Sequence, residues 1–600
     1  MTRLPHRTFE PAANKPVLAV KDLSVMLSRE GRRSRVLDGI SFDLFPGEIV
    51  ALVGESGSGK SSIGLTIQGL LPRESQPHVT GSILLTGTEL VGAGAHTLRH
   101  ARRHLVRAIS QDPMGALNPT MTIRRQMGES NGGSNASIVD WLSRTGLPDP
   151  DRIADALPHR LSGGQRQRVL IAMAVMAKPK LLIADEPNTA LDVTTQKQIL
   201  DLLRDHVREH TAILFVTHDL AVAASLADRV LVLYAGRVAE IGHIRDVIRN
   251  PAHPYSAGLL AARFDFNSDR LRPLPTLPPE RRHSVNVESA CAYATRCPLV
   301  QSDCTTIRPA LRPVSSHRGT AACLHAEQTP FLAKHSAASK PWPAQTTQEG
   351  IVLKLSNVGK SYPTGARSFW RARRPKPVLK SISLSIKVGE CVALVGESGA
   401  GKSTLLRIAA GLLACDSGKV SRFDNLLPQV VFQDPISALT PWLSIGEQIG
   451  ERLRALSRDR DYRRRRVGEA LKLVELDPVL MDALPAELSV GQCQRAVVAR
   501  GVIVRPKLLL CDEPISAMDV SLAATTLNLL GDLRRRLGMA MLFVTHDLAA
   551  ARIIADRIAV LKDGELVEVA DPDTLLAAPQ TAYTRSLIAA VPGLDSEQGR

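Results

Sequence analysis

Six hundred residues exceed what a single hydrophobic core supports, so we expect at least two domains. Hydrophobic residues make up 44% and charged residues 22%, as is typical of a soluble globular protein. The net charge of +16 would suit nucleic acid or an anionic membrane, but much of it lies in arginine clusters typical of solvated helix faces. No apolar run is long enough to span a bilayer and the N-terminus lacks a signal-peptide core, so the chain should remain in the cytoplasm.

Residues 1–16 are expected to form a tail, and residues 17–262 a first domain. Strand-like segments at 17–20 and 40–44 are followed by a glycine-rich motif. This motif lies between an apolar run at 49–53 and a helix-like run, which is the setting of a phosphate-binding loop. It reads Gly54-Glu55-Ser56-Gly57-Ser58-Gly59-Lys60-Ser61 and continues with Ser62.

The motif predicts how a nucleoside triphosphate is held. Its glycines let the backbone curl so that several N–H groups and a helix N-terminus converge on phosphate oxygens. Lys60 would reach the β- and γ-phosphates, and the hydroxyl of Ser61 would hold Mg²⁺. The first domain is therefore expected to bind ATP with Mg²⁺.

Three more side chains of the first domain follow predicted strands. Asp185 comes after the apolar run 181–184, so its carboxylate should project towards the phosphate loop and hold the Mg²⁺ shell. Glu186 comes next, where a carboxylate can polarise the water that attacks the γ-phosphate. His218 follows the strand-like run 214–217, which predicts an imidazole on the γ-phosphate side. A lone histidine after a strand is usually structural, but here the whole order recurs in the second half of the chain.

Between the domains, residues 263–349 are richer in proline, arginine and serine, which indicates a linker or a small accessory module. Four cysteines fall in this segment, namely Cys291, Cys297, Cys304 and Cys323. Four thiols in a loop-rich cytosolic segment can ligate a metal, and zinc is one candidate. Unligated thiols that only pack a small module are the alternative.

Residues 350–592 are expected to form a second domain that repeats the first, and residues 593–600 a second tail. The repeated loop reads Gly396-Glu397-Ser398-Gly399-Ala400-Gly401-Lys402-Ser403 and continues with Thr404. Its later counterparts are Gln433, Asp512, Glu513 and His546. The segment from the loop lysine to the following glutamine spans 51 residues in the first copy and 31 in the second. We attribute the difference to the loss of most of a β-hairpin around residues 81–90.

With these motifs in place, the chain resembles the nucleotide-binding subunits of ABC transporters over nearly everything outside residues 263–349. The signature peptide of that family matches Leu161-Ser162-Gly163-Gly164-Gln165 and Leu488-Ser489-Val490-Gly491-Gln492. Its glutamine loops match Gln111-Asp112-Pro113 and Gln433-Asp434-Pro435, and its D-loops match Ala190-Leu191-Asp192 and Ala517-Met518-Asp519. The resemblance implies an α/β fold of tandem P-loop NTPase (ABC-type) domains. Each would have a RecA-like core, an antiparallel β subdomain and a helical signature subdomain.

In this family two nucleotide domains face head to tail, and each ATP lies between one phosphate loop and the opposite signature. One chain can thus supply the whole dimer. Site one would combine the second signature with Lys60, Gln111, Asp185, Glu186 and His218. Site two would combine the first signature with Lys402, Gln433, Asp512, Glu513 and His546. The resemblance also implies that Mg²⁺ is held by Ser61, Asp185 and Gln111 in site one and by Ser403, Asp512 and Gln433 in site two.

Two departures from the family pattern both fall on site one. Val490 replaces a signature glycine, and a left-handed conformation there would cost a β-branched residue about 1–2 kcal/mol. The aromatic residue that stacks on adenine matches Tyr362 in the second domain but Leu27 in the first. We therefore predict that site two performs most of the hydrolysis. The alternative is that Val490 is tolerated because the rest of the signature and Glu186 are intact.

Local features resemble the peptide and nickel importer branch of the family. The sequence after each glutamine loop follows that branch's pattern, residues 250–256 match its HPY segment, and residues 581–584 are a degraded counterpart. The segment from Leu274 to Cys323 resembles the C-terminal module of the branch. That resemblance implies a [4Fe–4S] cluster on Cys291, Cys297, Cys304 and Cys323, with zinc or unligated thiols as the alternatives.

The importer resemblance implies two integral-membrane permease subunits as partners and, through them, an extracytoplasmic solute-binding protein. The chain would act at the cytoplasmic face of the bacterial plasma membrane, and segments 114–160 and 436–487 would form the grooves that receive the permeases. Dipeptides, oligopeptides, glutathione, nickel chelates and opine-like compounds all remain open as solutes.

A rival from another class is a soluble twin ATPase that acts on ribosomes or nucleic acid. The cysteines lie between the domains and the linker lacks a long charged helical pair, both of which disfavour that rival, so no nucleic-acid partner is expected. The HPY segment and the absence of fused membrane spans disfavour the ATPase of an exporter.

Overall fold

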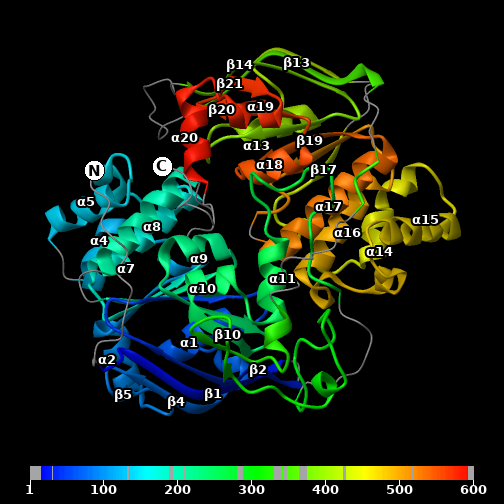
Figure 1. Cartoon of the computed structure of the whole chain (residues 1–600). Helices are drawn as coiled ribbons and strands as arrows, with labels where there is room; N and C mark the ends of the chain where they lie inside the picture. The colour runs from blue at the N-terminus through cyan, green and yellow to red at the C-terminus, as the bar shows by residue number, and fades with distance from the viewer. Residues whose placement is uncertain are drawn as a thin grey trace.

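The computed structural model describes residues 15–29, 32–131, 134–187, 193–207, 211–279, 288–329, 340–343, 348–363, 375–422, 428–516 and 518–591 (Figure 1). The predicted first D-loop, Ala190-Leu191-Asp192, lies outside the described residues, and so does Ala517 of the second. Met518 and Asp519 lie within them.

Each half of the chain is built around a mostly parallel sheet. The strand orders are β11-β12-β10-β9-β3-β8-β7-β6 and β17-β18-β19-β15-β20-β21. The strands of the first sheet are β3 (Ile49–Val53), β6 (Val106–Ile109), β7 (Leu181–Asp185), β8 (Ala212–Thr217), β9 (Arg229–Tyr234), β10 (Arg237–His243), β11 (Arg312–Pro313) and β12 (Gly319–Ala321). Those of the second are β15 (Cys391–Val395), β17 (Gln429–Val431), β18 (Leu508–Asp512), β19 (Ala540–Thr545), β20 (Arg557–Lys562) and β21 (Glu565–Ala570). Six strands follow the same order in both halves, which confirms the repeat.

The central strands are apolar along their whole length. Every residue of β3 and β8 is buried, as expected of parallel strands covered by helices on both faces. Val53 pairs with Thr217 of β8 and with Val232 of β9, so the carboxyl ends of neighbouring strands meet at one edge. The predicted site residues gather at this edge because they follow β3, β7 and β8.

An antiparallel β subdomain accompanies each core sheet. In the first domain its order is β2-β1-β4-β5, and in the second β14-β13-β16. The strands are β1 (Leu18–Arg29), β2 (Arg32–Leu44), β4 (His78–Leu85), β5 (Thr88–Glu89), β13 (Gln348–Pro363), β14 (Pro375–Val388) and β16 (Ser417–Arg422).

The predicted loss of a β-hairpin from the second copy is wrong in part. Strand β16 pairs with β13 as β4 pairs with β1, so this strand is retained. Only residues 423–428 separate β16 from β17. In the first domain the stretch between β4 and β6 contains β5 and helix α2 (Ala95–His104), so the shortening of the second copy falls in this stretch.

Helices cover the core sheets and form a separate subdomain in each half. Around the first sheet lie α1 (Lys60–Gln68), α8 (Val193–Val207), α9 (Leu220–Leu226), α10 (Ile244–Arg249) and α11 (Pro254–Ala262). Around the second lie α13 (Lys402–Ala410), α17 (Val520–Leu537), α18 (Leu548–Ile554), α19 (Pro572–Ala577) and α20 (Ala582–Ala590). The helical subdomains contain α3 (Pro113–Ala116), α4 (Ile123–Asn131), α5 (Asn135–Arg144), α6 (Pro150–Ala154) and α7 (Gly163–Met176), and α14 (Ile445–Gly450), α15 (Arg460–Leu473) and α16 (Val490–Val502). The predicted fold class is confirmed.

Where the two halves meet, each packs one of its helices against the other half. Helix α11 of the first domain packs on α17 of the second, and α20 of the second packs on α8 of the first (Figure 1). The chain that leaves α11 then follows the second domain. The amide of Leu274 donates to Asn528 Oδ1 at 2.8 Å, and the amide side chain of Asn528 donates back to the Leu274 carbonyl at 2.8 Å. Each half therefore helps to hold the other.

The cysteine-containing segment is built onto the first domain. Strand β12 pairs with β10 and so extends the first core sheet. Below that pairing, His317 Nε2 lies 2.8 Å from Glu240 Oε1, and both side chains are almost completely buried. The same carboxylate accepts hydrogen bonds from the amides of Ala252 and His253 at the start of α11. One buried carboxylate thus joins the sheet, the HPY segment and the cysteine segment.

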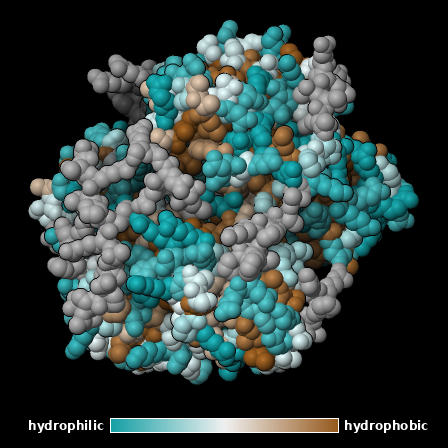
Figure 2. Space-filling view, in the orientation of Figure 1, coloured by the Kyte–Doolittle hydropathy of each residue, from teal (hydrophilic) through white to brown (hydrophobic). Residues whose placement is uncertain are grey.

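No helix in the described part of the chain combines the length and apolar character needed to cross a bilayer. On the face shown in Figure 2, hydrophilic residues predominate and hydrophobic residues form small separate patches.

Candidate active sites

Both phosphate loops fit tightly against the neighbouring strand. A Cβ atom added to Gly54 would lie 2.2 Å from the carbonyl oxygen of Leu233 on β9, so only glycine fits there. Gly59 has φ of 101° at the start of α1, a left-handed conformation that glycine adopts readily. The ammonium of Lys60 donates to the carbonyl oxygens of Gly54 and Glu55 at 2.7 and 2.8 Å. Two backbone carbonyl groups of the phosphate loop thus fix the position of the Lys60 ammonium.

The second phosphate loop repeats this geometry. A Cβ atom at Gly396 would lie 2.2 Å from the carbonyl oxygen of Leu561 on β20, and Gly401 has φ of 106°. Lys402 donates to the carbonyl oxygens of Gly396 and Glu397 at 2.7 and 3.0 Å. The predicted strand, loop and helix therefore stand together in both halves.

In site one the predicted catalytic side chains converge on one carboxylate. Glu186 lies 3.0 Å from His218 Nδ1, and the side-chain amide of Gln111 donates to it at 3.0 Å. Burial works against a charged imidazole, but the hydrogen bond and charge of Glu186 outweigh it and raise the pKa of His218. Glu186 has φ of 46°, an uncommon conformation for a residue with a side chain. The backbone is thus held in a position that aims the carboxylate at the site.

Site two has the same arrangement around Glu513. Its carboxylate lies 3.3 Å from His546 Nδ1, 3.3 Å from Gln433 Nε2 and 3.8 Å from Lys402 Nζ. Burial alone would raise the pKa of Glu513, but His546 and Lys402 lower it below its usual value. Burial likewise opposes charge on His546, yet Glu513 raises the pKa of that imidazole. Both members of the pair are therefore biased towards their charged forms.

The carboxylates predicted to hold Mg²⁺ lie beside the loop hydroxyls. Ser403 donates to Asp512 at 3.1 Å, and a hydrogen bond to Ser61 acts on Asp185 in the first domain. Burial raises the pKa of both carboxyls, and those hydrogen bonds only partly offset the shift. Among the described atoms, the buried Asp185 Oδ1 has no hydrogen-bond partner. A buried carboxylate oxygen beside a hydroxyl is the donor set that Mg²⁺ prefers, so these residues fit the ion.

Each signature peptide caps a helix. The Ser162 hydroxyl accepts from the amide of Gln165 at 3.2 Å, and the Gln165 side chain accepts from the amide of Ser162 at 3.0 Å. Ser489 and Gln492 form the same capping box on α16. Both signature serines are exposed. The N-termini of α7 and α16, with Gly163 and Gly164 in the first turn of α7, therefore remain open to solvent.

The structure overturns the backbone argument about Val490. This residue is the first of α16 and has no positive φ, and its side chain is exposed. At the corresponding Gly163, an added Cβ atom would meet nothing within 4 Å. Valine is therefore accommodated without backbone strain, because the signature begins a helix. Its effect, if any, must come from the side chain next to bound nucleotide.

The domains meet at the first phosphate loop. The amide of Ser56 donates to Asp519 Oδ2 of the second D-loop at 3.2 Å. The charge of Asp519 also acts on Lys60 and His218. The first loop thus faces the second domain, as expected of a head-to-tail pair. Tyr362 at the end of β13 is exposed, whereas Leu27 on β1 is partly buried against the first β subdomain.

Sequence analysis missed a role for the HPY segment. Tyr255 is completely buried on α11, and its hydroxyl accepts a hydrogen bond from the amide of Glu55 at 2.7 Å. Tyr583 on α20 accepts from the amide of Glu397 at 3.1 Å in the second domain. Both tyrosines therefore brace a phosphate loop. Their common offset of 328 residues, which His218 and His546 share, is the signal that could have revealed this.

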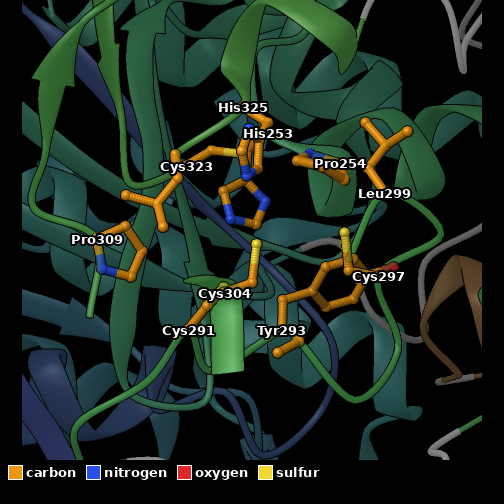
Figure 3. Close-up of a pocket in the computed structure, with 12 residues that line it drawn as sticks. His253, Pro254, Cys291, Tyr293, Cys297, Leu299, Cys304, Pro309, Cys323 and His325 are labelled. Carbon is orange, nitrogen blue, oxygen red and sulfur yellow. The ribbon is translucent and has the colours of Figure 1, made fainter. Parts of the chain in front are cut away.

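The four predicted cysteines line one small pocket (Figure 3). His253, Tyr293 and His325 line the same pocket. Burial raises the pKa of Cys297 to about 12 and that of Cys323 to about 11, and the neighbouring thiols add to both shifts. Cysteine thiolates are the usual ligands of zinc and of iron–sulfur clusters, and all four thiols line this pocket, so the type of donor fits such a group. Asp303, Cys304 and His325 also place ligand atoms within 4.8 Å of one another.

Comparison with known proteins identifies the family. The family model described as ABC transporter matches residues 37–189 and 379–516, and that of the oligopeptide/dipeptide transporter C-terminal region matches 239–304 and 567–600. The oligopeptide transport ATP-binding protein OppD of Mycobacterium tuberculosis is 39% identical over 616 residues, covering 97% of this chain and 99% of that protein. The chain belongs to the ATP-binding subunits of ABC transporters. As a member of that family it binds ATP through two ABC domains and hydrolyses it for transport.

Other relatives share the tandem organisation. The glutathione import ATP-binding protein GsiA of Escherichia coli is 35% identical over 628 residues, covering 100% of this chain and 92% of that protein. The peptidoglycan transport ATP-binding protein YejF of Agrobacterium fabrum is 36% identical and covers 96% of both chains. The solved structure of RNase-L Inhibitor covers 90% of this chain with a TM-score of 0.51 and 18% identity, which supports the tandem ABC fold alone.

The predicted permease grooves of this ABC subunit differ in surface character. Beside the second glutamine loop, large hydrophobic side chains are exposed, with Trp442 at 77% and Val479 at 79%. Other exposed hydrophobic residues of this region include Phe432, Ile436, Leu443, Leu456, Tyr462 and Leu484. Met114 is the corresponding exposed residue after the first glutamine loop, and its sulfur contacts Arg166. The second domain thus presents an apolar surface where the sequence predicts a permease contact.

The Glu513–His546 pair predicts a pH-dependent stability of the second domain. Because folding raises the pKa of His546, its contribution to the unfolding free energy is complete below about pH 6.5 and is lost as the pH rises through the raised pKa. Because folding lowers the pKa of Glu513, its contribution is complete above about pH 4.5 and is lost as the pH falls through the lowered pKa. The difference in unfolding free energy between wild-type and His546→Gln proteins should therefore be largest between about pH 4.5 and 6.5. Denaturant unfolding across this range checks it, with the exposed His159→Gln as control. A difference that does not change with pH would contradict it.

Proposed function

We propose that this chain is the energy-coupling ATPase of an importer for peptides or a related small solute such as glutathione. It binds two integral-membrane permeases at the cytoplasmic face of a bacterial plasma membrane. Through these permeases it works together with an extracytoplasmic solute-binding protein. The observation that carries the proposal is the full-length similarity to proteins named for oligopeptide and glutathione transport, including the HPY region. The exposed apolar side chains around Trp442 are suited to contact a permease segment.

The proposed domain organisation follows the repeat. Residues 1–16 and 593–600 are tails, 17–262 and 350–592 are the ABC domains, and 263–349 are the cysteine module and linker. The pairing of β12 with β10 adds that the module is attached to the sheet of the first domain.

In each site the lysine and loop amides bind the phosphates, and the glutamate acts on water. Glu186 accepts a proton from the water that attacks the γ-phosphorus, and His218 and Gln111 orient its carboxylate. Ser61, Asp185 and Gln111 would hold Mg²⁺, which supplies positive charge to the β- and γ-phosphate oxygens when bound. Glu513, His546, Gln433, Ser403 and Asp512 would perform the same roles in site two.

ATP hydrolysis by this chain is proposed to be unequal between the sites. Support comes from Tyr362 of site two, an aromatic residue with an exposed side chain, whereas the corresponding Leu27 of site one is aliphatic and partly buried against the first β subdomain. Val490 would place a branched side chain in site one where site two has Gly163. Unequal sites would give one ATP that remains bound while the other turns over.

The cysteine module is proposed to hold a [4Fe–4S] cluster on Cys291, Cys297, Cys304 and Cys323. Their placement around one pocket supports this, because thiolates are the usual ligands of such clusters. When bound, the cluster would cross-link loops that otherwise have little secondary structure.

The unequal sites predict unequal effects of removing each catalytic carboxylate. Glu513→Gln should lower the ATPase rate of the chain by about tenfold or more, and Glu186→Gln by about twofold or less, because general-base removal silences only its own site. Steady-state phosphate release measures both, with the exposed Glu74→Gln as control. Equal losses in the two variants would contradict the asymmetry.

The cluster proposal predicts a colour and a metal content. Protein purified without oxygen should be brown, absorb broadly in the visible range and contain about four iron atoms per chain. Cys297→Ser should lose this absorbance, whereas Cys415→Ser, outside the module, should keep it. A colourless protein containing zinc or no metal would contradict the cluster.

The importer function predicts the partners of a trapped complex. The double variant Glu186→Gln, Glu513→Gln should bind ATP without turnover and be purified from detergent extract of its native host. Two multi-span permeases should accompany it, and the binding protein that works with them identifies the solute. Ribosomes or nucleic acid without a membrane partner would overturn the importer function and favour the soluble twin ATPase.

A further inference from the structure

Three clustered tyrosines, of which Tyr255 and Tyr293 are buried and Tyr234 is partly buried, connect the cysteine module to the first phosphate loop. The ring of Tyr255 lies 4.7 Å from that of Tyr234 and 5.4 Å from that of Tyr293, and Tyr234 and Tyr293 are 5.1 Å apart. Tyr293 belongs to the turn between Cys291 and Cys297, and Tyr234 ends β9 beside the phosphate loop. The turn that carries two of the cysteines therefore rests directly on the residue that braces the loop.

Arg296 makes a second connection from the same turn. Its guanidinium forms hydrogen bonds with both carboxylate oxygens of Glu55, at 2.7 and 3.3 Å, and its Nε donates to the Pro278 carbonyl at 2.8 Å. The Arg296 and Glu55 side chains are only 15% and 19% exposed. A partly buried bidentate pair of this kind fixes both position and orientation. Arg296 also directly precedes Cys297, so its backbone moves with that thiol.

Glu55 passes this constraint to the phosphate-binding groups. Its carbonyl oxygen accepts hydrogen bonds from the ammonium of Lys60 at 2.8 Å and from the amide of Ser58 at 3.2 Å. Its own amide donates to Tyr255. A shift of Glu55 therefore displaces the lysine that binds the β- and γ-phosphates together with the loop amides.

A tyrosine braces the second phosphate loop as well. Glu397 donates its amide to Tyr583, and the ammonium of Lys562 lies 4.9 Å from the centre of the Tyr583 ring. The bidentate pair between Arg296 of the cysteine module and Glu55 acts on the phosphate loop of site one.

We propose that Arg296 is a positioning residue for the first phosphate loop, through which the cysteine module controls ATP binding at site one and leaves site two unaffected. The inference rests on the proposed ATP site one. Because coupling between two sites is reciprocal, ATP at site one also slows the opening of the cysteine turn.

Site-resolved nucleotide labelling of the full chain tests the proposal. Protein is titrated with Mg²⁺ and 8-azido-ATP in the cold and irradiated, and labelled peptides from each half are quantified by mass spectrometry. Arg296→Ala should raise the half-saturating concentration at site one by about tenfold and at site two by less than about twofold, within the usual range of coupling between sites. Arg296→Lys should restore part of the affinity, because lysine keeps the charge without the bidentate geometry.

Two further variants keep the test decisive. Glu55→Gln removes the ion pair from the loop side and leaves the module intact, so it should reproduce the loss even if Arg296→Ala loosens the module. Arg308→Ala is the matched control, because Arg308 is a module arginine that pairs with Asp38 at 3.0 Å on β2 and not with the loop. It should leave labelling of both sites unchanged.

The reciprocal measurement is the alkylation rate of the peptide that contains Cys291 and Cys297, with and without a non-hydrolysable ATP analogue. The analogue should slow alkylation about threefold or more in the wild type and have no effect in Glu55→Gln. This readout does not depend on ATPase activity.

The outcomes separate the inference from the proposed function. If the first half of the wild type takes no label, the proposed site one is wrong and the inference falls with it. If that half is labelled normally in Arg296→Ala and Glu55→Gln, the site stands and the inference is overturned. An equal loss in Arg308→Ala would also overturn it, because it would show that Arg296 only attaches the module.

Discussion

The contact between each phosphate loop and a backbone carbonyl of the neighbouring strand is among the tightest contacts at the described glycines. At Gly54 and Gly396 an added Cβ atom would come within 2.2 Å of a backbone oxygen, a distance that no other residue type can meet. That fit places the loop, the strand and the helix behind it in one rigid unit. In each domain the loop lysine and the carboxylate that ends β7 or β18 are then held facing one another by the fold itself. Phosphoryl transfer depends mainly on such positioning and on electrostatics, so the fit is the foundation of the chemistry.

The same principle extends from each site to the pair of domains. Helices α11 and α20 each begin beside their own sheet, brace their own phosphate loop through a tyrosine, and pack on the opposite domain. Loop geometry and domain contact are therefore joined in one short helix. In the first half the cysteine module also contacts the phosphate loop. The two halves therefore share one architecture, but this additional contact belongs to the first half.

Much of the site could be predicted because its parts are local in sequence. The glycine spacing specifies a loop, an apolar run of five residues specifies a buried parallel strand, and a carboxylate after such a strand must emerge at the edge of the sheet. The order of these motifs therefore predicted that Lys60, Asp185, Glu186 and His218 meet. The fold class followed from the repeat and the family resemblance together.

What sequence reasoning missed depends on contacts between distant segments or on the exact backbone. Arg296 lies 241 residues from Glu55, and nothing near either residue indicates the other. The argument that Val490 restricts the backbone of site one depended on a left-handed conformation at that position, whereas Val490 begins a helix and has no positive φ. The shorter second copy was attributed to a lost hairpin, although a spacing difference cannot say which element is missing.

The covalent link between the halves has a consequence for how the subunit assembles. The Thr329 hydroxyl donates to the Ala252 carbonyl of the first domain, and β13 of the second domain begins at Gln348. A tether this short keeps the second domain at a high effective concentration next to the first. Pairing is then insensitive to dilution, and a domain cannot be exchanged for its counterpart from another transporter. Because both domains belong to one chain, two ATP sites that differ in sequence are always encoded together and assembled with each other.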